Sequence, residues 1–141
     1  MKGWFAVAAT VTASVVMALC SGCFLRAERI PQKTAHVTVD YVTRTSHAVT
    51  CNQVQWLLTA DITAAPARVR VLLNLDSGAP KVESVNIDNY NDFTGVADAG
   101  AGNATAVFTR DTYTITGQAQ GSRHNDPAVS TTAPFTIEVG C

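Results

Sequence analysis

The stretch ARVRVLLNLDSGAPKVESVNID, residues 67–88, decides the fold class of this chain. In its first half, apolar side chains at every second position alternate mainly with arginine and asparagine, the pattern of a β-strand with one buried face. The run from Asp76 to Pro80 then contains the serine, glycine and proline that are typical of a turn. We expect the second half to return as an antiparallel strand with a β-bulge near Ser84, where its alternation slips. A shorter strand starting at Glu83 would explain the slip equally well.

The same period of two recurs along most of the remaining chain. Apolar rows of this kind occupy residues 37–41, 54–62, 104–108, 113–119 and 135–141. A tight turn at Arg110–Asp111 joins two of these rows, whereas the polar residues 121–133 are expected to form a surface loop. Because helical periodicity is almost absent, the sequence predicts an all-β fold. We expect an antiparallel β-sandwich or small open barrel of about eight strands, with one disulfide.

The first 23 residues have the features of a bacterial export signal that ends in a lipidated cysteine. Lys2 precedes an uncharged, mostly apolar run, residues 4–19, which is too short for a permanent membrane-spanning helix. The motif Ser21-Gly22-Cys23 follows, with small residues before a thiol that can accept a diacylglycerol. We therefore expect residues 1–22 to be a cleaved signal peptide and Cys23 to be the lipidation site. The alternative is an ordinary secretory signal that happens to contain two cysteines.

Processing at this point leaves one domain behind a short tether. Residues 23–35 include a proline and lack a sustained period, so we expect a lipidated tether, followed by a single β domain over residues 36–141. Without Lys2, nine lysines and arginines stand against eleven aspartates and glutamates. There is no basic stripe to bind phosphates, so nucleic acid is not an expected partner. Contact with the membrane is expected through the acyl chains instead.

The cysteines divide between these segments. Cys20 leaves with the signal peptide and Cys23 takes the lipid, so Cys51 and Cys141 remain as a pair. Outside the cytoplasm such a pair is expected to be oxidised to a disulfide. A catalytic or metal-binding role is less favoured, because neither cysteine belongs to a Cys-x-x-Cys motif or has a histidine at ligand spacing.

Familiar catalytic motifs are absent from the sequence. It contains no Gly-x-Ser-x-Gly, no His-Glu-x-x-His and no phosphate-binding P-loop. Ser46 and His47 are adjacent, but neighbouring residues of a strand point to opposite faces, so they are a poor start for a nucleophile and base. The polar run 88–92 lacks the glycine and terminal glutamate of an EF-hand and is expected to be a polar turn. We expect no metal site, no cofactor, and solvated positions for the histidines His36, His47 and His124.

Four segments together resemble a known family. They are VESVNIDNYN (82–91), GNATA (102–106), YTITGQAQG (113–121) and FTIEVGC (135–141), and they are similar to the mycobacterial 19-kilodalton lipoprotein antigen family. The resemblance covers nearly all of residues 36–141, and it implies a lipid-anchored envelope protein without known enzymatic activity. It also implies exposure at the cell surface and detection by host innate receptors through the acyl chains. The glycosylated Ser/Thr/Ala-rich segment of that family has no counterpart here, where the tether contains only Thr34, so glycosylation is not expected.

These observations predict a non-enzymatic, acylated lipoprotein that presents a small β domain at the extracytoplasmic face of the cell membrane or in the cell envelope. A carrier or binder of an apolar, lipid-like ligand is the alternative. Its binding site would be an unfilled interior between the sheets, although the same side chains would also make an ordinary core. The candidate lining residues are Trp56, Leu58, Phe108 and Phe135. An enzyme is the least favoured class.

Overall fold

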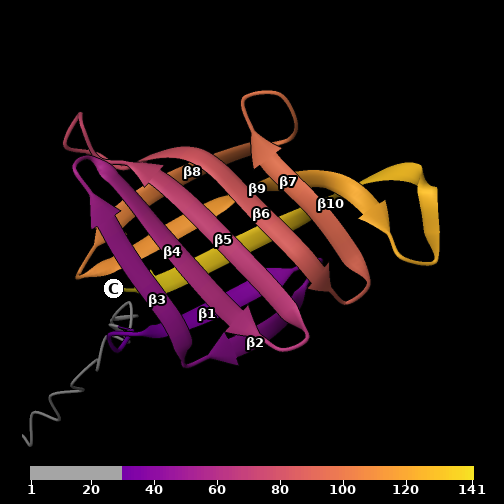
Figure 1. Ribbon diagram of the computed structural model, residues 1–141, viewed down its shortest axis with the longest axis horizontal. Coiled ribbons are helices and arrows are strands. Elements are labelled where there is room, and N and C mark those ends of the chain that lie inside the picture. Colours follow the sequence, from indigo (N-terminus) through magenta and orange to yellow (C-terminus); the bar gives the residue numbers. More distant parts are fainter. Residues whose placement is uncertain (1–29) are drawn as a thin grey trace, which may run out of the picture.

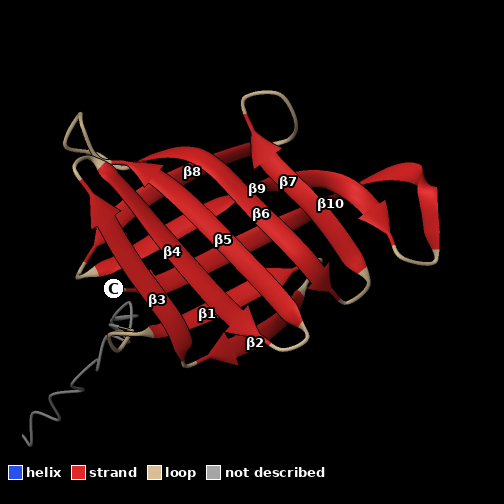
Figure 2. Cartoon of the chain, viewed as in Figure 1, coloured by secondary structure: helices blue, strands red, loops and turns tan. Residues whose placement is uncertain are grey.

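The computed structural model describes residues 30–141, which form ten antiparallel β-strands and no helix. Figure 2 shows strands joined by short turns throughout this part of the chain. The predicted signal peptide, Cys23 and most of the tether lie outside the described residues. The strands are β1 (Thr34–Val39), β2 (Val42–Ser46), β3 (Ala48–Val54), β4 (Leu57–Ala64), β5 (Ala67–Asn74), β6 (Lys81–Tyr90), β7 (Phe93–Asp98), β8 (Asn103–Thr109), β9 (Thr112–Arg123) and β10 (Asp126–Gly140).

All ten strands belong to one sheet that folds over into two layers (Figure 1). Its order is β2-β1-β10-β9-β7-β6-β5-β4-β3, and β8 pairs with β9 beside β7. In Figure 1, β3 to β7 form one layer, and β8, β9, β10, β1 and β2 cross behind it. The fold class predicted from the sequence is confirmed: the protein is all-β and antiparallel, with a sheet that nearly closes on itself.

Strand β9 is where the sheet passes from one layer to the other. It pairs with β10 along its length on one side, and on the other side with β8 first and then with β7. Gly121 faces Gly95 at the pairing with β7, and a Cβ on Gly121 would collide with the backbone of Thr94. The ring of Phe93 covers Gly95 from the same strand. The missing side chains therefore allow the close approach of β7 and β9 at this turning point.

The stretch that predicted the fold forms the centre of one layer. Val69 and Val71 of β5 are buried and pair with Ile87 and Val85 of β6, while the intervening arginines face solvent. The register shifts after the pair Leu72–Ser84, because Leu73 pairs with Val82 and Glu83 has no opposite residue. The predicted bulge near Ser84 is confirmed. Burial of one apolar face on each layer gives a single core, as the alternation requires.

Two of the predicted strands contain turns that the alternation of apolar and polar residues does not reveal. The row 54–62 is a hairpin, in which Val54 pairs with Leu57 across a turn at Gln55 and Trp56. Trp56 lies two positions before Leu58, the first buried residue of β4, so the apolar row in the sequence continues into the turn. The row 37–41 likewise ends at Val39, because Asp40 and Tyr41 both have positive φ and form the β1–β2 turn. These turns, together with β7, raise the number of strands from about eight to ten.

The prediction of a surface loop at residues 121–133 is wrong. Strand β9 continues to Arg123 and β10 begins at Asp126, so the segment is a long hairpin that projects beyond the rest of the sheet. Arg123 pairs with Asp126, and after an irregularity Gly121 pairs with Thr131. Most side chains of the hairpin are exposed on both faces, so no alternation marks it in the sequence. Its β-branched threonines and valine nevertheless suit a strand.

The domain begins slightly before the predicted boundary at residue 36. Strand β1 starts at Thr34, Ile30 is buried, and the amide of Lys33 donates to the carbonyl of Gly140 at 2.7 Å. Thr34 itself pairs with Gly140. The chain therefore enters the domain beside its carboxyl end, at the end of the molecule marked C in Figure 1.

Candidate functional site

The disulfide predicted from the cysteine count is present between Cys51 and Cys141. Its Cα atoms are 5.8 Å apart and its partners are 90 positions apart in the sequence. Cys51 lies in β3 at one end of the sheet, and Cys141 follows β10 in the middle of the other layer. The bond therefore joins the two layers covalently and has the structural role that the sequence predicts.

The structure does not bring together the four residues predicted to line an apolar site. Leu58 and Phe135 are buried within the core cluster, as an ordinary core requires. Trp56 is 59% exposed and Phe108 is 49% exposed, with the ring of Phe108 4.4 Å from that of Tyr113. The expectation that Trp56 and Phe108 point inward is wrong. Both residues lie in or next to a hairpin turn, where a side chain can escape the interior.

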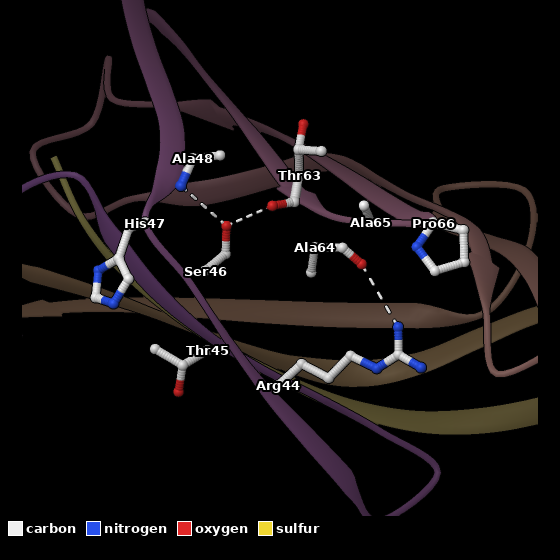
Figure 3. A pocket seen from close by; sticks show the side chains of 9 residues that line it. All are labelled: Arg44, Thr45, Ser46, His47, Ala48, Thr63, Ala64, Ala65 and Pro66. Carbon is white, nitrogen blue, oxygen red and sulfur yellow. Dashed lines mark hydrogen bonds between the residues drawn. The ribbon is translucent and has the colours of Figure 1, made fainter.

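An open pocket lies where the two ends of the sheet meet (Figure 3). Strands β2 and β3 end the sheet on either side and do not pair with each other. Side chains bridge this seam, because Ser46 Oγ donates to the carbonyl of Thr63 at 2.5 Å and Arg44 donates to that of Ala64 at 3.5 Å. Residues 44–48 and 63–66 line the pocket. We call this feature the seam pocket.

Ser46 and His47 do not form a nucleophile and base in the seam pocket. The Ser46 hydroxyl donates to the Thr63 carbonyl and accepts from the Ala48 amide at 3.1 Å. His47 Nδ1 instead lies 3.4 Å from the Thr34 hydroxyl oxygen. Figure 3 shows the imidazole of His47 directed away from Ser46. The serine is buried and its hydrogen bonds hold the seam together, which is a structural role.

Tyr90 is the residue of this region that sequence reasoning missed. Its side chain is 1% exposed, and its hydroxyl lies 2.7 Å from the carbonyl oxygen of Val37 and 2.8 Å from that of Val42. The Arg44 guanidinium lies 5.0 Å from the centre of the ring. Burial raises the pKa of the phenol, and the nearby Arg44 charge partly opposes that rise. Tyr90 therefore clamps β6 of one layer to β1 and β2 of the other.

The polar run around Tyr90 concealed its role. In β6 the buried side chains change parity between Ile87 and Tyr90, because the register with β7 shifts there and Asn89 has positive φ. The prediction of a polar turn over residues 88–92 is wrong for its first three residues, which belong to β6; only Asn91 and Asp92 form the turn. The signal that could have found Tyr90 is an aromatic residue inside a polar run next to an apolar strand end.

The remaining candidate residues are dispersed over the described part of the chain. His36 lies in β1, and His47 and His124 lie in the turns after β2 and β9. Within residues 30–141 no group of three His, Cys, Asp or Glu side chains is arranged to hold a metal ion. The same residues include no helix suited to crossing a bilayer.

Comparison with known proteins identifies the family. The family model described as Mycobacterium 19 kDa lipoprotein antigen matches residues 28–141. The chain belongs to this family. A putative lipoprotein of Mycobacterium avium subsp. hominissuis is 34% identical over 96% of this chain and 93% of its own length. The probable lipoprotein LppE of Mycobacterium tuberculosis is also 34% identical, over 96% of both chains.

The lipoprotein LpqH of Mycobacterium avium is similar over a smaller region. This lipoprotein is 32% identical over 68% of the present chain and 60% of its own length. The resemblance seen in the sequence is thus confirmed, and the 19 kDa lipoprotein antigen family accounts for all ten strands, because its model begins before β1 and ends at Cys141.

Proposed function

We propose that this chain is a non-enzymatic, lipid-anchored envelope protein that presents its β domain outside the cytoplasmic membrane. The observation that carries the proposal is the family match over residues 28–141, which begins five residues after Cys23. The relatives bear the name lipoprotein, and Ser21-Gly22-Cys23 supplies a site at which this chain could be lipidated. The acyl chains then contribute about 0.8 kcal/mol per buried methylene to membrane binding.

The folded domain supports presentation rather than catalysis. Its seam pocket is lined by a serine engaged in structural hydrogen bonds, and the described histidines lie apart from one another. The partners we propose are the membrane, through the acyl chains, and host innate receptors that contact the same lipid. No contact among the described residues favours the carrier hypothesis, because two of the four expected lining residues face solvent.

The test is lipidation of Cys23 in the full chain. We expect wild-type protein to partition into the detergent phase, with an intact mass showing a chain that starts at residue 23 and carries acyl groups. Cys23→Ala should remain in the aqueous phase. Cys20→Leu is the matched control, because it removes the neighbouring cysteine and leaves Ser21-Gly22-Cys23 intact; its partitioning should match wild type. The proposal would be refuted if Cys23→Ala partitioned into the detergent phase and its mass differed from that of wild type only by the substitution.

A further inference from the structure

Large apolar side chains are exposed mainly at one end of the domain. In the described part of the chain, five of the eight exposed large hydrophobic residues lie near the β3–β4 turn or near the end of β8. We call them the apolar tip; they are Val54, Trp56, Leu57, Val107 and Phe108. Apolar groups gathered on a monomer surface commonly mark a contact with a partner or a membrane.

The apolar tip is at the same end of the molecule as the entry of the chain. Phe108 pairs with Tyr113 beside the β8–β9 turn, and the adjacent Thr112 pairs with Gly140. Gly140 in turn accepts the hydrogen bond from Lys33. On the other layer, Trp56 lies at the turn that follows β3, the strand bonded to Cys141 through Cys51. Figure 1 shows both turns and the carboxyl end at one end of the long axis.

The length of the tether determines what the apolar tip can reach. Six residues, 24–29, separate Cys23 from the first described residue, Ile30. Fully extended, the chain from Cys23 to Ile30 spans at most about 25 Å. If Cys23 is acylated, as the proposed function requires, this end of the domain stays within that distance of the lipid headgroups. The bilayer is therefore the apolar surface that the tip meets at high effective concentration.

The chemistry of the tip suits a lipid interface. Tryptophan has an apolar ring system and one N–H donor, and it is enriched where membrane and water meet. The aliphatic side chains of Val54 and Leu57 flank it in the sequence and face solvent with it. Among residues 30–141, the charged residues near this end have both signs; they are Lys33, Asp76, Lys81, Glu83, Arg110 and Asp111. The mixture offers no net attraction to anionic lipid, so the contact should be apolar.

We propose that the apolar tip docks the domain end-on against the bilayer that holds its lipid anchor, with Trp56 inserted among the headgroups. The inference rests on the proposed function for the anchor itself. The inference goes beyond the proposed function because it assigns the folded domain a second, non-covalent contact with the membrane. The domain is then held at two points and keeps a fixed orientation, with the β9–β10 hairpin directed away from the lipid.

Tryptophan fluorescence tests the docking directly. Trp4 and Trp56 are the two tryptophans of the chain, so Trp4→Phe leaves Trp56 as the sole reporter even if the signal peptide is retained. The full-length lipoprotein with this change is reconstituted into phosphatidylcholine vesicles. We expect emission at shorter wavelength than that of the soluble Trp4→Phe/Cys23→Ser protein. Bromine-labelled lipid should quench the emission, because a tryptophan ring at the interface lies close to the lipid. Aqueous acrylamide should quench it less than it quenches the soluble protein.

The control reporter is placed at the other end of β1. Tyr41 lies in the β1–β2 turn and is strongly exposed, so Trp4→Phe/Trp56→Phe/Tyr41→Trp carries one tryptophan far from the apolar tip. Brominated lipid should leave its emission unchanged. Equal lipid quenching of the two reporters would overturn the proposed orientation. Adding phosphatidylglycerol to the vesicles should not alter the quenching of Trp56, and a requirement for anionic lipid would contradict the apolar contact.

Flotation of the vesicles separates failure of this inference from failure of the proposed function. Protein that has no acyl mass and does not float with the vesicles would refute the lipid anchor. Protein that is acylated and floats, but whose Trp56 remains as open to acrylamide as in the soluble form, would refute docking of the tip while leaving the anchor intact.

Discussion

Replacing Tyr90 with phenylalanine removes a single oxygen atom from the contact between the two layers. The ring stays in the core, so the packing against its neighbours is retained and no cavity forms. The carbonyl oxygens of Val37 and Val42 lose the hydroxyl that lies 2.7 and 2.8 Å from them. One hydroxyl has one proton to share between two acceptors. The loss of stability should therefore exceed that of a surface hydrogen bond and be smaller than that of two full hydrogen bonds.

We expect Tyr90→Phe to lower the free energy of unfolding by about 1–2 kcal/mol, because a buried acceptor that loses its donor costs about 1–3 kcal/mol. In a domain of this size that corresponds to a fall in melting temperature of roughly 4–12 °C. Urea unfolding followed by circular dichroism gives the difference, and an unchanged slope with urea would show that the unfolded state is unaffected. Fluorescence is a poor probe here because Trp56 is already exposed.

Tyr113→Phe is the matched control for this measurement. Tyr113 is half-buried, and its hydroxyl makes no hydrogen bond to another described residue, so its removal should change stability by no more than about 0.5 kcal/mol. If the two variants unfold at the same urea concentration, the Tyr90 hydroxyl does not link the layers and the reasoning fails.

Further predictions concern the disulfide, pH and surface residues. Cys51→Ser/Cys141→Ser should lose up to about 4.6 kcal/mol of stability, the chain-entropy value for closing a loop of this length, and reductant should destabilise wild type but not the variant. Burial raises the pKa of Tyr90 in the folded protein, so as the pH rises the phenol of the unfolded chain loses its proton first. Stability should therefore be intact below about pH 10 and fall above it, and the fall should be smaller in Tyr90→Phe. Trp56→Ala should cost far less than the 3–5 kcal/mol of a core tryptophan, as urea unfolding would show, because the ring faces solvent. Changes of about 0.5 kcal/mol or less, with no loss of cellular phenotype, are expected for His36→Ala, His47→Ala, His124→Ala and Asp88→Asn.

Alternation of side chains predicted the fold class because both layers bury one face. Strands β5 and β6 show this most clearly, and even the bulge at Glu83 is visible as a slip in the period. What alternation could not reveal is a two-residue turn whose apolar residue keeps the parity of the strand, as Trp56 does. It also could not reveal the β9–β10 hairpin, since a strand that is exposed on both faces has no alternating pattern.

In the candidate site too, the sequence could predict one feature and could not predict others. The Cys51–Cys141 bond could be predicted because cysteine chemistry depends on compartment and number, which the sequence records. The role of Tyr90 could not, because it depends on a local change of register that turns a side chain from one face to the other. The seam pocket was equally hidden, since it arises where the two ends of the sheet meet and nothing in the local sequence fixes that meeting.

The direction of β1 has a mechanical consequence. The strand starts where the chain enters the domain and runs lengthwise between β10 and β2. A pull on Lys33 away from this end therefore acts along the strand and loads its hydrogen bonds to both neighbours together, in shear, instead of opening them one after another. If β1 and β2 do yield, extension stops at Cys51, because its bond to Cys141 keeps the following strands in a closed loop.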